Sequence, residues 1–329
     1  MKRTFAHKVS YLMPLHNLPL MLLMKKQASN FAVLIFLTAI LPPAAAQQDS
    51  TTYTQFNKKK CILATTAIVA ASSVSYIALD ELWYNNYERT SLHSFNDNTE
   101  WLQMDKVGHF MTSYQLGIAG YETFRWCGMD EKHSTWLGGS LGTIYLTGLE
   151  ILDGRSKAWG FSWGDETANF SGSLFFIGQQ LLWNEQRVKM KFSFTPSSLS
   201  HCRPEVLGET FSQQILKDYN GQTYWMSGNI SSFMSSENNF PKWLNMAIGY
   251  GADGMTTAHD YAESVGTCGD QDITRTRQFF LSPDIDLTRI NTRSKFLKSF
   301  FRVISFVKLP FPVVEYSVDK GWFVHSFYF

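Results

Sequence analysis

Three short segments, DKVGHF (105–110), EILD (150–153) and DETAN (165–169), place acidic and polar residues at the ends of long apolar runs. Within each segment the first and last polar residues stand three or four positions apart, which puts them on one face of a helix. Ionisable groups beside apolar segments are costly to bury unless they meet partners. We therefore expect the three segments to face one another in one polar cluster.

The helices that carry these segments are expected to meet at one end of a bundle. One helix begins near residue 105, the next ends near residue 152 and another begins near residue 165. In an up-and-down bundle these three points lie together. The glycine- and tryptophan-rich segment 153–164 predicts a tight loop between the last two helices, and basic residues are expected to compensate the acids. The predicted members of the cluster are Asp105, Lys106, His109, Glu150, Asp153, Arg155, Ser162, Asp165 and Asn169.

The charge and composition of the 329 residues exclude some classes of protein. The formal net charge is +1, from 29 Lys and Arg against 28 Asp and Glu, so no basic excess indicates a nucleic-acid partner. Charged residues make up 17% of the chain and aromatic residues 15%. This combination indicates much buried or lipid-facing surface.

Residues 1–46 have the features of a signal or targeting segment. Two lysines precede a short apolar run, and the sequence PPAAA (42–46) ends in a small-residue cleavage site. We expect cleavage after Ala46 and a mature protein in the cell envelope, periplasmic and membrane-associated. The leader is complete from Met24 onward, so Met24 competes with Met1 as the start. An uncleaved N-terminal anchor is the competing interpretation.

Four helices are expected in the segment 61–186, after a polar linker at 47–60. They correspond to the helical-length runs 61–79, 105–126, 134–152 and 165–183. The first run is just long enough to span a bilayer, but its serines make a buried bundle helix an equally good explanation. Gly138 and Gly142 in the third run form a pattern that lets helices approach closely.

The segment 187–329 favours strands. Apolar and polar residues alternate at 189–194, 275–279 and 284–287, a further strand fits 245–251, and turn formers stand at 220–221, 253–254 and 282–284. Residues 295–307 predict a basic amphipathic helix. Long strands are too few for a closed barrel, so a small packed sheet with its aromatics in the core is expected. The predicted fold class is α+β, with a four-helix bundle followed by a smaller β-containing region.

The four cysteines contain no CxxC pair, so they do not indicate a zinc ribbon. In an oxidising compartment they are compatible with a disulfide between Cys202 and Cys268. The alternative is four independent cysteines that pack as small apolar residues.

The chain resembles the YfiM-like family of predicted envelope lipoproteins, a domain of unknown function (2279). The resemblance rests on WLQMDKVGHF (101–110), ExxDG (150–154), GFSxxDxxxN (160–169), KDYNGQTYW (217–225) and GYGADGM (249–255). It implies an envelope protein and brings no established reaction with it. The chain departs from a lipoprotein pattern in having no cysteine near the expected cleavage point.

A looser likeness relates the same residues to the VanZ-like membrane proteins. Those proteins carry an Asp-Lys-x-x-His-Phe helix start, a Glu at the end of the next helix, and an Arg, Asp and Asn entering the last. The corresponding positions here are Asp105, Lys106, His109, Glu150, Arg155, Asp165 and Asn169. This likeness implies a four-helix, VanZ-like bundle with its polar residues at one end.

Three interpretations of the cluster are open. The first is a structural or binding role in an envelope protein whose partner is membrane lipid or another envelope component. The alternative is an envelope enzyme in which His109, with Glu150, Asp153 and Asp165, acts as acid or base or holds a divalent metal ion. In the third, the acids only cap helices. The paired Glu-x-x-His signature of di-iron bundles is absent, and no organic cofactor is expected.

Overall fold

The computed structural model describes residues 55–82, 84, 87–235, 237, 239–258 and 273–329. The helices of the first half are α2 (Lys58–Leu82), α3 (Met104–Trp126), α4 (Glu131–Gly139), α5 (Leu141–Asp153) and α6 (Trp163–Trp183). The strands are β1 (Val188–Phe194), β2 (Gln222–Asn229), β3 (Leu244–Asp253), β4 (Thr276–Ile285), β5 (Phe311–Ser317) and β6 (Gly321–Tyr328). Between strands lie the short helices α7 (Pro204–Leu207), α8 (Phe211–Lys217) and α9 (Lys295–Val303). The expected targeting segment at 1–46 lies outside the described residues.

The helical half holds one more helix than the sequence predicts. The run expected as one helix over 134–152 is divided into α4 and α5 at Ser140, which ends one helix and begins the other. Gly138 and Gly139 directly before this break have low helix propensity. The Asp130 carboxylate accepts a hydrogen bond from the His133 amide and caps α4, so that helix begins before residue 134. The expected four-helix bundle is therefore corrected to five helices in the described part of this half.

Glycines let α3 pack directly against its neighbours. A Cβ atom at Gly142 in α5 would lie 2.2 Å from the Ser113 carbonyl oxygen of α3. A Cβ atom at Gly138 in α4 would lie 2.2 Å from the Tyr121 amide nitrogen of α3. A side chain at either position would collide with backbone. The close approach predicted from the spacing of these two glycines is confirmed, and α3 is the partner helix.

Two glycines of α6 give a matched test of this packing. A Cβ atom at Gly172 would lie 2.2 Å from the Phe110 carbonyl oxygen, whereas nothing lies within 4 Å of one at Gly178. We expect Gly172→Ala to lower the free energy of unfolding by about 1–3 kcal/mol, because α3 and α6 must move apart. Gly178→Ala should raise it by about 0.5–1 kcal/mol, since alanine has the better helix propensity. Urea denaturation measures both, and equal effects would contradict the packing.

The six strands form one antiparallel meander in the order β1-β2-β3-β4-β5-β6. The strands expected at 189–194 and 245–251 are β1 and β3. The strands expected at 275–279 and 284–287 are one strand, β4, so the turn expected between them is wrong. Ser282 pairs with Ala247 and Pro283 with Met246 inside the ladder, because the neighbouring strand holds the backbone extended there.

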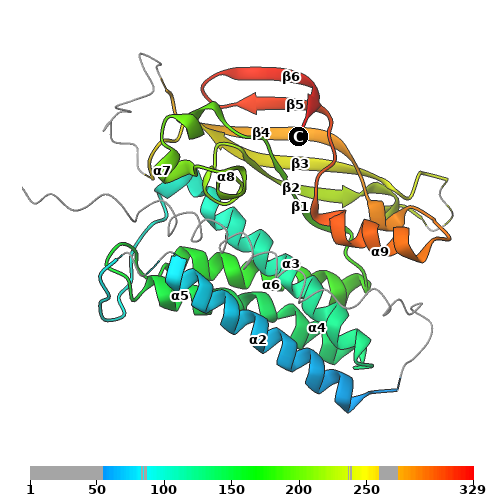
Figure 1. The fold of residues 1–329 in the computed structure, drawn as a ribbon. Coiled ribbons are helices and arrows are strands. Elements are labelled where there is room, and N and C mark those ends of the chain that lie inside the picture. Colours follow the sequence, from blue (N-terminus) through cyan, green and yellow to red (C-terminus); the bar gives the residue numbers. More distant parts are fainter. Residues whose placement is uncertain (1–54, 83, 85–86, 236, 238, 259–272) are drawn as a thin grey trace, which may run out of the picture.

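One apolar core joins the helices to the sheet. Its buried members come from α3, α6 and strands β1 to β3, and they are Met104, Met111, Tyr114, Phe176, Ile177, Met190, Tyr224, Ala252 and Met255. Helix α3 therefore lies between the sheet on one side and α6 on the other, as Figure 1 shows. The polar residues that open α3 are placed next to both.

The sheet exposes apolar side chains on one face, and its other face buries polar side chains beside apolar ones. Along β3, Met246 and Ile248 are exposed, whereas Asn245 and Ala247 are buried. This is the reverse of an antiparallel sheet with one solvated face, in which the outward residues are polar. The expectation that the C-terminal aromatics lie mainly in the core is wrong for several of them, including the exposed Trp322.

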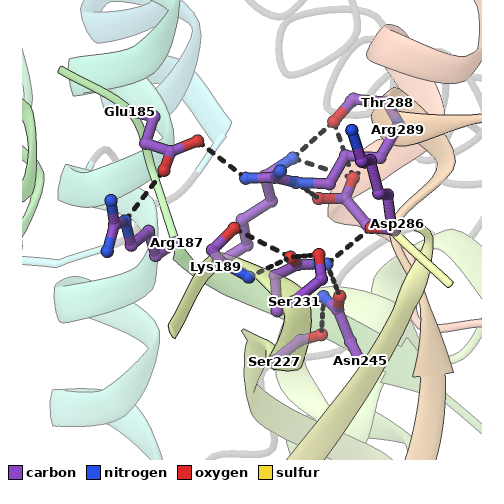
Figure 2. A network of polar contacts seen from close by, with 12 residues as sticks. Glu185, Arg187, Lys189, Ser227, Ser231, Asn245, Asp286, Thr288 and Arg289 are labelled. Atoms are coloured by element: carbon purple, nitrogen blue, oxygen red, sulfur yellow. Dashed lines mark hydrogen bonds and ion pairs between the residues drawn. The ribbon is translucent and has the colours of Figure 1, made fainter. Parts of the chain in front are cut away.

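A network of charges ties the end of the helical half to the sheet (Figure 2). Glu185, two residues beyond α6, accepts hydrogen bonds from Arg187 at 2.8 Å and from Arg289 at 2.9 Å. Asp286 follows β4. Its carboxylate forms ion pairs with Lys189 of β1 at 2.8 Å and with Arg289 at 3.3 Å. Burial opposes ionisation of Asp286, but Lys189 outweighs it and lowers the pKa of this carboxyl. The junction between the two halves is therefore held by ionised groups.

Among the described helices, α2 is long and apolar enough to cross a membrane by length and composition, over Lys58–Glu81. Cys61 in this helix and Cys127 after α3 are free thiols. Cys202 is disulfide-bonded. Cys268, its expected partner, lies outside the described residues, so the pairing stays a prediction.

Candidate functional site

The start of α6 is built around a serine cap. The Ser162 hydroxyl accepts a hydrogen bond from the Asp165 amide at 3.1 Å and donates one to Asp97 at 2.6 Å. The Ser162 amide donates to Glu150 at 3.0 Å. A side-chain oxygen on the free amides of a first turn is the usual helix cap. Here the cap also fixes the end of α5, because Glu150 belongs to that helix.

The start of α3 follows a strained segment. Trp101, Leu102 and Gln103 all have left-handed backbones, with φ of 47°, 50° and 63°. Such conformations cost about 1–3 kcal/mol each for residues with side chains, so the surroundings must hold them. The Arg277 guanidinium of β4 donates to the Leu102 carbonyl oxygen at 2.9 Å. The sheet therefore sets the point at which α3 begins and the placement of Asp105 in its first turn.

Lys106 lies among three carboxylates. Its ammonium is 2.7 Å from Asp97, 2.8 Å from Asp165 and 3.6 Å from Asp105. Burial opposes the charged form, but the neighbouring Asp105 and Asp165 outweigh it and raise the pKa of Lys106. Lys106 is therefore the permanent positive charge of the cluster.

His109 lies about one turn further along α3 and faces Asp105 and Glu150. Its Nε2 atom is 3.8 Å from Asp105 and 3.8 Å from Glu150. Its side chain is 19% exposed and that of Asp105 28%, so both side chains are half-buried. Burial opposes the charged form of the imidazole, but Asp105, Asp165 and Glu150 outweigh it and raise the pKa of His109.

The hydrogen bond at the other ring nitrogen of His109, Nδ1, determines the tautomer of the imidazole. Nδ1 lies 2.9 Å from the Asn169 side-chain oxygen, and the Asn169 amide nitrogen is directed to Glu166 at 3.4 Å. An amide oxygen only accepts, so Nδ1 carries a proton. In the neutral ring Nε2 then has a free lone pair, directed toward the carboxylates. Metal-binding histidines are commonly oriented by such a bond from the non-ligating nitrogen.

Asp105, His109 and Asp165 can hold a metal ion. Each offers one ligand atom, and these three atoms lie within 4.8 Å of one another. Ligands at 2.0–2.2 Å from one ion are separated by about 3–4 Å, so small side-chain movements would complete the site. Tyr219 donates a hydrogen bond to Asp105 at 2.7 Å and restrains that carboxylate from the sheet side.

The cluster has more acids than bases. Asp97, Asp105, Glu150, Asp153 and Asp165 surround one lysine and one histidine. Burial and neighbouring acids raise the pKa of Glu150 to about 8, while His109 opposes the shift. The same two causes raise the pKa of Asp153 and of Asp165 to about 7. Protonation or a bound cation would relieve this excess of negative charge.

These shifts predict that the protein loses stability as pH rises. A carboxyl whose pKa is raised in the folded state binds more protons than in the unfolded chain, so its contribution is greatest below its unfolded pKa and is lost as pH passes its folded pKa. For Glu150 that window runs from its ordinary 4.5 to about 8. We expect a lower melting temperature at pH 8 than at pH 5.5 in the presence of a chelator. Glu150→Gln should reduce the difference, and an unchanged difference would contradict the assignment.

The structure brings eight of the nine expected residues into one region. Arg155 is the exception, because it is exposed and forms no ion pair with any described residue. Of the two basic residues expected to compensate the acids, Lys106 lies among them. Asp153 lies at the edge, where it accepts a hydrogen bond from Tyr84 at 2.9 Å. Sequence reasoning missed Asp97, which stands in a polar segment typical of turns. It also missed Tyr84 and Tyr219, for which no local spacing gave a signal.

Comparison with known proteins gives a match for part of the helical half only. No curated protein and no solved structure matches the chain. Residues 92–177 match the model of a family described as predicted periplasmic lipoprotein (DUF2279). This segment contains Asp97 and all nine predicted residues, and the description agrees with the cell-envelope location expected from the leader. The segment from residue 92 to residue 177 is thus similar to the predicted periplasmic lipoproteins of DUF2279.

Proposed function

We propose that this envelope protein binds one divalent transition-metal ion through Asp105, His109 and Asp165. The observation that carries the proposal is the convergence of their three ligand atoms within 4.8 Å. The orientation of His109 supports it, since Nδ1–H donates a hydrogen bond to the Asn169 side-chain oxygen and Nε2 remains free to bind. Glu150, 3.8 Å from Nε2, is a fourth candidate ligand.

The donor set favours a transition metal over Mg²⁺ or Ca²⁺. One imidazole with two or three carboxylates suits Zn²⁺ and Mn²⁺, whereas Mg²⁺ and Ca²⁺ prefer oxygen ligands alone. Lys106 already neutralises Asp97 and part of Asp165. The ion would compensate the remaining acids and would link the start of α3 to the start of α6. A structural or binding role follows directly, and no reaction is required.

Titration calorimetry of the chelator-treated protein with Zn²⁺, Mn²⁺ and Mg²⁺ tests the proposal. We expect one Zn²⁺ or Mn²⁺ per chain and much weaker binding of Mg²⁺. Binding should release protons and weaken as pH falls, because the ion competes with the proton on His109. The melting temperature should rise with ion concentration. Absence of saturable binding, or binding that is insensitive to pH, would contradict the proposal.

A further inference from the structure

Helix α9 presents its apolar side to solvent. Phe296 is 75% exposed and Phe300 45%, and Leu297 and Val303 on the same side are also exposed. The Phe296 and Phe300 rings stack on each other, with centroids 6.3 Å apart. A surface helix of a soluble protein normally turns its apolar stripe toward the core. In α9 no described residue covers these four side chains enough to bury them.

The opposite side of α9 is basic. Lys295, Lys298 and Arg302 follow a spacing of three and four, which places them on one face. The whole segment from Arg289 to Lys308 contains no acidic residue. Lys295 and Lys298 are exposed and form no ion pair with the described residues. Arg302 lies 3.5 Å from Glu122 of α3.

We propose that α9 lies in the surface of a membrane that contains anionic lipid. An exposed apolar face with Phe and Leu and a basic face on the opposite side are the pattern of helices that rest at the boundary of headgroups and acyl chains. The positive charge of α9 favours anionic lipid as its partner, because lysines without acidic partners attract anionic headgroups. A second copy of this chain would have to bring an acidic surface to the same lysines. The inference is independent of the proposed cation site.

Hydrogen exchange of the full mature chain, read on peptides that cover residues 295–303, tests the proposal. The chain is compared in lipid nanodiscs of phosphatidylcholine alone and of phosphatidylcholine with phosphatidylglycerol. We expect protection of this segment with the anionic discs and little with the neutral ones. The readout is local, so it does not depend on whether α2 also holds the protein to the bilayer.

Two double variants separate the apolar and charge contributions. Phe296→Ser with Phe300→Ser should abolish the protection, because the apolar face is removed. Lys295→Gln with Lys298→Gln should weaken binding to anionic discs about fivefold per lysine. All four side chains are exposed, so the fold is expected to persist.

A control variant removes the same charge elsewhere. Lys132→Gln with Lys157→Gln, both at exposed positions outside α9, should leave the protection unchanged. Equal protection in neutral and anionic discs would overturn the proposal, as would no protection in either. Protection that appears without lipid and grows with protein concentration would overturn it in favour of a second copy.

Discussion

Replacing His109 by alanine is expected to weaken Zn²⁺ binding by about 100-fold or more. The imidazole is the only nitrogen ligand among the three groups that converge, and its Nε2 atom is held toward the carboxylates by the Asn169 contact on Nδ1. Without the imidazole, only the carboxylates of Asp105 and Asp165 remain of the three ligands, and two carboxylates bind a transition metal weakly. Titration calorimetry at neutral pH measures the loss.

A second histidine provides the matched control for this variant. His133 is exposed on α4 and lies 2.5 Å from Asp130, so it is also a histidine beside a carboxylate. His133→Ala should leave the affinity for Zn²⁺ unchanged. Circular dichroism of both variants shows whether the fold persists. If the two substitutions weakened binding equally, the ion would be bound elsewhere.

Replacing Asp284 by alanine is expected to lower the free energy of unfolding by about 3–5 kcal/mol. Asp284 and Lys191 are both 0% exposed and lie 2.6 Å apart, and Lys308 is 3.8 Å from the same carboxylate. The substitution leaves two lysines buried without their acid, and an unpaired buried charge is far more costly than the pair itself is stabilising. Lys191→Met should cost less, because Lys308 still faces Asp284.

An exposed ion pair of the same kind is the control for Asp284. Asp253 and Lys320 lie 2.8 Å apart, and their side chains are 34% and 45% exposed. Asp253→Ala should therefore change the free energy of unfolding by about 0–1 kcal/mol. Urea denaturation of both variants at neutral pH gives the comparison. Similar losses in the free energy of unfolding would show that burying the Asp284 ion pair does not make its disruption more costly.

The position of the cluster could be predicted because it follows from spacing. Asp105 and His109 are four residues apart, Asp165 and Asn169 likewise, and Glu150 ends its helix at the expected place. Local periodicity therefore carries the information on which helix ends meet. The function of these residues is a separate matter and stays a prediction until an ion is detected.

Long-range contacts explain what the sequence did not reveal. Asp97 joins the cluster because a loop brings it to Ser162, and Tyr219 reaches Asp105 from 114 residues away. No periodicity connects such positions. Gly138, two residues before the break at Ser140, packs against the backbone of α3, which is a tertiary contact. Inside β4, pairing with β3 overrides the local turn preference of Ser282 and Pro283.

Location of the ion by anomalous diffraction tests the central claim most directly. Crystals of the Zn²⁺-loaded protein would be measured on both sides of the zinc absorption edge. A site formed by Asp105, His109 and Asp165 predicts one strong anomalous peak about 2.0–2.2 Å from His109 Nε2 and from an oxygen of each carboxylate. A peak at another place on the chain, or none at this cluster under saturating Zn²⁺, would contradict the account.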